Sequence, residues 1–109
     1  MESYRLGEIV LLSFPFAGVT EVKRRPAMVL LDTGDEDIVV ARITSQVVQA
    51  PFDVELVEWR QAGLLLPSVV RVHKVATLEK RLVERRLGAL TVGDLARVRA
   101  VIHRLWTSI

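Results

Sequence analysis

Short apolar runs separated by polar turn residues fill the first two thirds of the chain. The runs Glu8–Phe14, Ala27–Leu31, Ile38–Ile43 and Ser68–Val72 are short and rich in Val, Ile and Leu, so each predicts a buried strand. Phe52–Val57 instead alternates apolar and polar residues, which predicts a strand buried on one face. The pattern therefore predicts a mostly β structure.

Proline, glycine and clustered polar residues predict where these strands end. Pro15 removes a hydrogen-bond donor and Gly18 permits tight turns, so we expect the first strand to break there. Residues 77–90 fit a helix or a strand equally well. The predicted turns and loops are residues 14–24, 32–37, 44–46 and 59–66.

The last segment predicts an amphipathic helix from Thr91 to about Trp106. Thr91 is a favoured N-cap, and Asp94 three residues later completes a pair like a capping box. The apolar residues that recur at helical spacing are Leu95, Val98, Ile102 and Leu105. Short strands followed by one helix predict a single domain over residues 1–109, a small barrel closed by its C-terminal helix.

Composition narrows the class of protein. Half of the 109 residues are hydrophobic, which is enough for a core in one domain. The chain has no cysteine, which excludes disulfides and thiolate metal sites and fits a reducing cytoplasm. The apolar stretch after Glu8 is too short for a signal peptide or a membrane span. We therefore expect a cytoplasmic protein without a membrane partner.

The net charge of +2 is unevenly distributed. Residues 1–58 hold ten acids and five bases, whereas residues 59–109 hold three acids and ten bases, and twelve of the fifteen bases are Arg. The guanidinium group pairs with phosphate through two parallel hydrogen bonds. The basic half indicates an anionic partner such as nucleic acid, although a solvated arginine-rich surface would give the same counts.

Few residues suit metal or cofactor chemistry, so we expect neither. His73 and His103 lie on different elements without a second ligand nearby, and the acidic turn 32–37 is typical of a solvated hairpin. No glycine-rich phosphate loop or serine nucleophile elbow is present. What remains is a set of polar residues near predicted strand ends, each unremarkable alone: Arg24, Arg25, Thr44, Ser45, Arg71, His73 and Lys74.

Several of these residues lie in segments that resemble the PemK/MazF toxin family over nearly the whole chain. The Arg-Pro strand and the Ile-Thr-Ser turn, in this order and spacing, carry most of the specificity. The matching segments are Gly7–Val10, Arg25–Leu30, Ala41–Gln46, Gly63–Leu64, Pro67–Val70, Lys74–Leu78 and Leu87–Leu90. The resemblance implies an SH3-like β-barrel with a C-terminal helix, a twofold homodimer, and a short helical turn followed by a strand within residues 77–90.

The resemblance also implies a function and a site. It implies a type II toxin, a metal-independent endoribonuclease (mRNA interferase) that cleaves single-stranded RNA through its 2′-hydroxyl and is blocked by a cognate antitoxin protein. The family's catalytic residues fall on Arg25 and Thr44, and an arginine that some PemK-like members also use falls on Arg71. His73 stands where those members carry a carboxylate, and imidazole can act as base or acid near neutral pH. The expected further RNA contacts are Lys23, Arg24, Ser45, Gln46 and Lys74.

Two alternatives fit the same fold. Small SH3-like barrels also bind RNA or peptides without cutting them, and an inactive relative could serve as a regulator. The joint presence of Arg25, Thr44 and Arg71 favours catalysis, because a binding module does not need all three.

Overall fold

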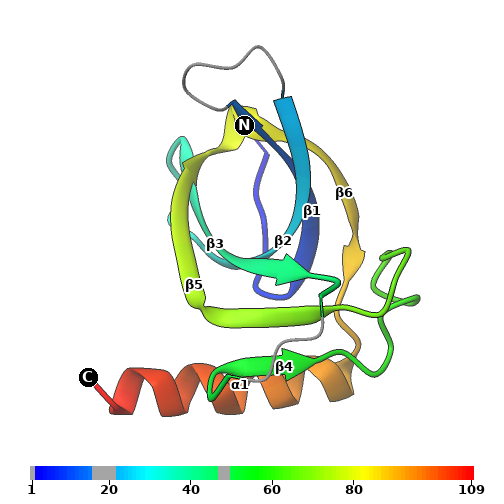
Figure 1. Cartoon of the computed structure of the whole chain (residues 1–109). Coiled ribbons are helices and arrows are strands. Elements are labelled where there is room, and N and C mark those ends of the chain that lie inside the picture. The colour runs from blue at the N-terminus through cyan, green and yellow to red at the C-terminus, as the bar shows by residue number, and fades with distance from the viewer. Residues whose placement is uncertain (1, 16–21, 47–49) are drawn as a thin grey trace.

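The computed structural model describes residues 2–15, 22–46 and 50–109, which form one curled antiparallel sheet and one long helix (Figure 1). The sheet order is β4-β5-β3-β2-β1-β6. The elements are β1 (Glu8–Pro15), β2 (Val22–Asp32), β3 (Asp37–Thr44), β4 (Asp53–Glu55), β5 (Val69–Glu79), the 3₁₀ turn η1 (Lys80–Leu82), β6 (Val83–Ala89) and α1 (Val92–Thr107). The mostly β fold with a C-terminal helix is confirmed, as is the helical turn and strand within residues 77–90.

The central strands are buried on both faces, which explains their apolar runs. Ile9, Met28 and other residues pack toward α1, while neighbouring residues such as Val10 and Val29 pack inside the curled sheet. Successive side chains of a strand point to opposite faces, so a strand between two cores needs apolar residues at nearly every position. Figure 1 shows β1, β2, β3, β5 and β6 curling around the inner core, with α1 lying across one end.

The loop predicted for residues 14–24 is wrong at both of its ends. β1 continues to Pro15 and β2 begins at Val22, so that Ser13 pairs with Arg24. The rest of that prediction, residues 16–21, lies outside the described residues. The charged residues at the end of this segment suggested a loop because their partners on neighbouring strands could not be known from the sequence. Here Arg24 Nε donates to a carboxylate oxygen of Glu84 on β6 at 2.7 Å.

The prediction that a strand ends at Val72 is also wrong, because β5 continues to Glu79. Ala41 pairs with Val75 but Arg42 pairs with Arg71, so residues 72–74 are extra on the β5 side. Extra residues on one strand bend it, and the bend of β5 is visible in Figure 1. His73 and Lys74 therefore lie at a bend inside a long strand and not at a strand end. The half-buried strand predicted for residues 52–57 is shorter, with only Asp53–Glu55 paired.

The sheet is open, which is a minor departure from the expected SH3-like β-barrel. Among the described residues no pairing joins the edge strands β4 and β6. Instead the segment after β4 packs directly on β6 at Gly63 and Gly88. A Cβ atom placed on Gly63 would lie 2.0 Å from the carbonyl oxygen of Leu87. Two glycines without side chains thus allow a backbone contact that bridges the two edges.

Asp94 connects α1 to the segment that follows β4. Thr91 is the N-cap as predicted, because its side chain accepts the N–H of Asp94 at 3.4 Å. The buried Asp94 carboxylate accepts the N–H groups of Val57 at 3.1 Å and Glu58 at 2.9 Å and pairs with Arg97 at 2.5 Å. Burial raises the pKa of Asp94, but these hydrogen bonds outweigh it and leave the pKa below its usual range.

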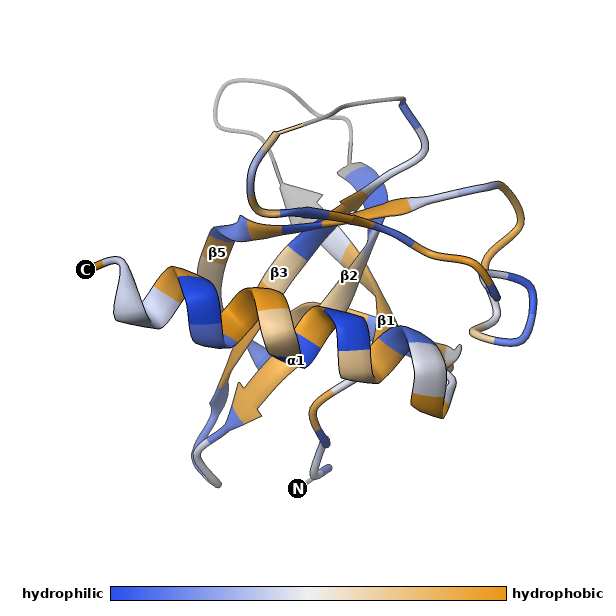
Figure 2. Ribbon diagram, turned by 90° about the horizontal axis from the view of Figure 1, so that it is seen from below, coloured by the Kyte–Doolittle hydropathy of each residue, from blue (hydrophilic) through white to orange (hydrophobic). Residues whose placement is uncertain are grey.

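The α1 helix itself is amphipathic. Figure 2 shows hydrophilic and hydrophobic bands alternating along α1, which lies across the end of the curled sheet. Val98 is fully buried on the inner side of the helix, whereas Trp106 on the last turn is 73% exposed. No helix in residues 2–15, 22–46 and 50–109 is long and apolar enough to cross a membrane.

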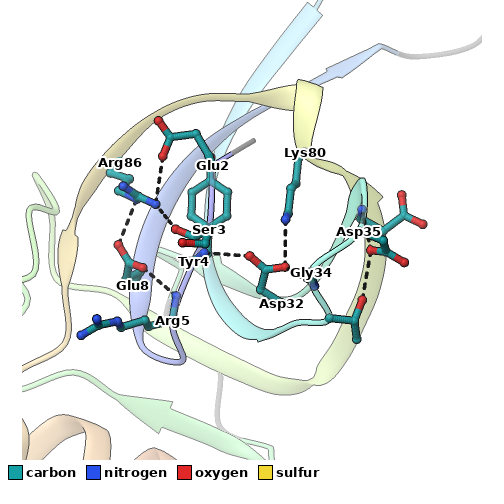
Figure 3. A network of polar contacts seen from close by, with 12 residues as sticks. Glu2, Ser3, Tyr4, Arg5, Glu8, Asp32, Gly34, Asp35, Lys80 and Arg86 are labelled. Carbon is teal, nitrogen blue, oxygen red and sulfur yellow. Dashed lines mark hydrogen bonds and ion pairs between the residues drawn. The ribbon is translucent and has the colours of Figure 1, made fainter.

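A polar network ties the N-terminal segment to the turn between β2 and β3 (Figure 3). Lys80 Nζ lies 2.9 Å from one carboxylate oxygen of Asp32, and the other oxygen accepts the N–H of Tyr4 at 2.8 Å. The N–H of Gly34 donates to the same carboxylate at 2.8 Å. The hydrogen bond from Lys80, helped by those from Gly34 and Tyr4, lowers the pKa of Asp32 to about 2.

This low pKa predicts a loss of stability in acid. A carboxylate whose pKa is lowered by folding stabilises the protein above its unfolded pKa of about 3.8, and that contribution disappears as the pH falls toward 2. Asp32→Asn should therefore lower the urea midpoint at pH 6, and the difference from wild type should shrink between pH 4 and pH 2. Exposed Glu36 provides the control variant Glu36→Gln. A difference that is unchanged at pH 2 would contradict the assignment.

Candidate active site: an arginine-lined cleft

A cleft opens where two neighbouring strands separate. The pairing of β2 with β3 ends at Ala27 and Arg42. Beyond that point β2 continues beside β1 through Arg25, and β3 continues beside β5 through Thr44. Pro26 lies at the point of divergence and has no N–H to donate, which fits the end of the pairing. The cleft at this point has a volume of about 500 Å³.

The lining of the cleft is cationic and hydroxyl-rich. Four predicted site residues meet there: Arg25, Thr44, Ser45 and Gln46. The other lining residues are Leu11, Pro26, Arg42, Ile43, Gly63, Leu64, Leu65, Leu66, Ser68, Arg85 and Leu87. None of the lining residues that the structure describes is Asp or Glu. The cleft therefore suits a ligand that is anionic and has apolar parts.

No salt bridge joins the three arginines of the cleft to a carboxylate of the described residues. Among the described residues, Arg25, Arg42 and Arg85 make no side-chain hydrogen bond and no salt bridge, and all three are exposed. The arginines that do pair with a carboxylate lie elsewhere: Arg24, Arg71, Arg81, Arg86 and Arg97. Unpaired guanidinium groups that converge on one cleft make it attractive to phosphate.

The hydroxyl of Thr44 is oriented for donation. Its oxygen accepts the backbone N–H of Gln46 at 3.2 Å, a local turn that fixes the position of the oxygen. Because this contact uses only a lone pair, the hydroxyl proton of Thr44 is free to donate to a ligand. The turn after β3 thus supplies a donor to the same cleft that Arg25 lines.

Arg71 and His73 are placed differently from the other predicted catalytic residues. Neither lines the cleft. Arg71 lies opposite Arg42 on β3 and Asp53 on β4, and its Nε donates to Asp53 Oδ1 at 3.1 Å. His73 Nδ1 is 4.0 Å from the same oxygen and is buried without a hydrogen-bond partner among the described residues. The charge of Arg71 is therefore compensated inside the protein by Asp53.

The remaining predicted RNA contacts lie outside the cleft lining. Lys23 and Arg24 are on β2, and Arg24 pairs with Glu84, whose pKa this hydrogen bond lowers. Lys74 is exposed at the bend of β5. These residues stay predictions, because an extended ligand could reach beyond the cleft.

Three residues of this region were missed at the sequence level. Arg42 could have been found, since it lies two residues before Thr44 and alternate residues of a strand share a face. Asp53 lies on the polar face of a predicted strand, but its salt bridge to Arg71 could not be predicted without the order of the strands in the sheet. The position of Arg85 could not be predicted because it lies on β6, in the segment whose sequence fits a helix and a strand equally. Within the described residues no group of three or more His, Asp or Glu could hold a metal ion.

Fold and cleft together define a small curled-sheet domain with an arginine-lined cleft. The chain belongs to the family of PemK-like, MazF-like toxins of type II toxin–antitoxin systems, whose model matches residues 5–106. No curated protein matches the chain significantly in sequence.

Solved structures of similar fold agree with this membership. MazF in the MazE–MazF complex from Deinococcus radiodurans is 27% identical, with 94% of each chain covered and a TM-score of 0.75. MazF alone from the same organism is 26% identical, with 98% of this chain and 99% of that chain covered and a TM-score of 0.73. An endoribonuclease in complex with its cognate antitoxin from a mycobacterial species is 16% identical over 96% of each chain, with a TM-score of 0.73, which shows the fold alone.

Proposed function

We propose that this toxin is an endoribonuclease that binds single-stranded RNA in the arginine-lined cleft and cleaves it without a metal ion. The observation that carries the proposal is the joint presence, in one cleft, of the Thr44 hydroxyl and three guanidinium groups without a salt bridge, with no Asp or Glu among the described lining residues. Family membership supports the same activity.

The reaction requires an internal nucleophile and stabilisation of charge. The RNA 2′-oxygen attacks the adjacent phosphorus, a base takes the 2′ proton, and the bond to the 5′-oxygen breaks as that oxygen receives a proton. The products are a 2′,3′-cyclic phosphate and a 5′-hydroxyl end. Arg25 would clamp the phosphoryl oxygens through two N–H donors, and Thr44 would add a third donor. DNA lacks the 2′-hydroxyl and would not be cleaved.

His73 remains the proposed base or acid. Its Nδ1 is buried and lies 4.0 Å from the Asp53 carboxylate, so Nε2 would be the atom that exchanges a proton with RNA. Arg71 lies beside cleft-lining Arg42 on the same sheet face and would hold Asp53 in place for this purpose.

The test is RNA cleavage by purified protein in excess chelator, with a long unstructured RNA as substrate. We expect cleavage at a limited set of sites, 5′-hydroxyl and cyclic phosphate ends, and no cleavage where the nucleotide on the 5′ side of the site is 2′-deoxy. An Arg25→Ala preparation purified in parallel controls for contaminating ribonuclease. Binding without any cleavage would instead indicate an RNA-binding module, and activity that requires a divalent ion would exclude the metal-free reaction.

We also propose that the chain forms a homodimer and is blocked by an antitoxin protein, as in the MazE–MazF complex of similar fold. Apolar side chains available for such contacts are Leu65 beside the cleft, 92% exposed, and Trp106 on α1, 73% exposed. An antitoxin segment that carries carboxylates could neutralise Arg25, Arg42 and Arg85 in place of RNA phosphates. Binding of antitoxin and RNA would then be mutually exclusive and sensitive to salt.

A further inference from the structure

Strand β6 carries three charged residues in a row, and the middle one differs from its neighbours. Glu84 is paired with Arg24, and Arg86 is paired with Glu2 and Glu8. Arg85 makes no hydrogen bond or salt bridge within the described part of the chain, and of the three only Arg85 lines the cleft. Its guanidinium is therefore available to a ligand, whereas its two neighbours fasten β6 to β2 and to the N-terminal segment.

Arg85 and Arg25 line the same cleft from strands that are not neighbours. Leu11 on β1 pairs with Arg85 on β6 and with Pro26 on β2, and both Leu11 and Pro26 line the cleft. Neighbouring strands are about 4.8 Å apart, so the backbones that carry Arg85 and Arg25 are separated by about 10 Å. The cleft lining thus combines two cations carried two strands apart with two half-buried apolar side chains.

We propose that Arg85 binds the phosphate next to the scissile one, so that the cleft holds one nucleoside on Leu11 and Pro26 between two phosphates. This inference rests on the proposed ribonuclease function of the cleft. RNA alternates charged phosphates with less polar nucleosides, and the cleft lining offers two cations carried two strands apart together with apolar side chains. Arg85 is thus a positioning residue for the substrate and has no contact with the reacting atoms.

This role predicts a particular kinetic signature. A contact to a phosphate that does not react is equally strong in the bound substrate and in the transition state, so its loss raises KM and leaves kcat unchanged. Arg85→Gln should raise KM at least about tenfold, the usual size of a lost charge-assisted hydrogen bond. Arg85→Lys keeps the charge but loses the second donor, so its KM should lie between those of the wild type and Arg85→Gln.

The decisive experiment removes the charge of the RNA phosphate that Arg85 is proposed to bind. A short oligonucleotide that contains the mapped cleavage site is synthesised with one flanking phosphate at a time replaced by an uncharged methylphosphonate. One replacement should raise KM of the wild type as much as Arg85→Gln does, and should have no further effect on Arg85→Gln. Arg81→Gln, a variant of an exposed arginine on η1 that pairs with Glu79, is the control and should behave as wild type.

Each result decides a different point. Cleavage by the wild type with an Arg85→Gln variant of unchanged KM would overturn this inference and leave the proposed function intact. A fall in kcat in Arg85→Gln would place Arg85 on the scissile phosphate and overturn the two-phosphate arrangement. A wild type that neither binds nor cleaves the unmodified oligonucleotide would overturn the proposed function together with the inference. Thermal melts of both variants verify that the fold is retained.

Discussion

Arg25→Ala should lower kcat for RNA cleavage by at least about a hundredfold, the usual cost of removing a group that stabilises charge in a transition state. Arg25 is exposed at the rim of the cleft and has no partner within the described residues, so its removal leaves no buried charge behind. We therefore expect the free energy of unfolding to change by less than about 0.5 kcal/mol. Steady-state kinetics and a urea titration measure the two quantities.

The comparison needs a variant that removes the same charge elsewhere. Arg81→Ala removes an exposed guanidinium that lies outside the cleft, so it should retain wild-type kcat. An Arg25→Ala protein that folds normally and cleaves RNA at the wild-type rate would remove Arg25 from the site. Equal losses in both variants would mean that overall charge, and not the cleft, governs activity.

Gly63→Ala should destabilise the protein by about 3 kcal/mol. The residue has a φ of +88°, a region that costs side-chain-bearing residues about 1–2 kcal/mol. The new Cβ would also lie 2.0 Å from the carbonyl oxygen of Leu87, so β6 or the segment after β4 must move. Thermal unfolding should show a fall in Tm of more than about 10 °C.

Gly34 separates these two causes. It has the same φ of +88° in the turn between β2 and β3, but a Cβ placed there would have no neighbour within 4 Å. Gly34→Ala should therefore cost only the backbone strain, about 1 kcal/mol. A similar loss in both variants would show that the contact between the segment after β4 and β6 contributes little. Because Gly63 lines the cleft, RNA cleavage should fall in Gly63→Ala but not in Gly34→Ala.

Local signals in the sequence sufficed for elements whose stabilising contacts are local. Thr91 and the apolar spacing after it predicted the start of α1 and nearly its end. Such local signals gave wrong predictions where pairing with a strand distant in the sequence determines the backbone conformation. Lys23 and Arg24 look like loop residues until their pairing with β1 is known, and His73 looks like a strand end until β3 is seen to resume pairing at Val75.

Only part of the candidate site could be predicted from the sequence. Arg25 and Thr44 belong to motifs that can be recognised in the sequence, and both line the cleft. The tether from Asp94 to the backbone of Val57 and Glu58 was not predictable, because a carboxylate at this position normally turns back to its own helix. The sequence also could not distinguish Arg85 from Arg86, because only the folded sheet shows that Arg86 is paired with carboxylates and Arg85 is not.

The pairing of β1 with β6 also has a consequence for synthesis. Leu11 near the start of the chain and Arg85 near its end line one cleft and are direct neighbours in the sheet. A nascent chain that has emerged only as far as β5 has neither the β6 side of the cleft nor the helix that covers the outer core. Contacts of such large sequence separation form late and slowly. The ribosome must therefore release the chain beyond β6 before the arginine-lined cleft exists, so translation products that stop before β6 would lack the cleft.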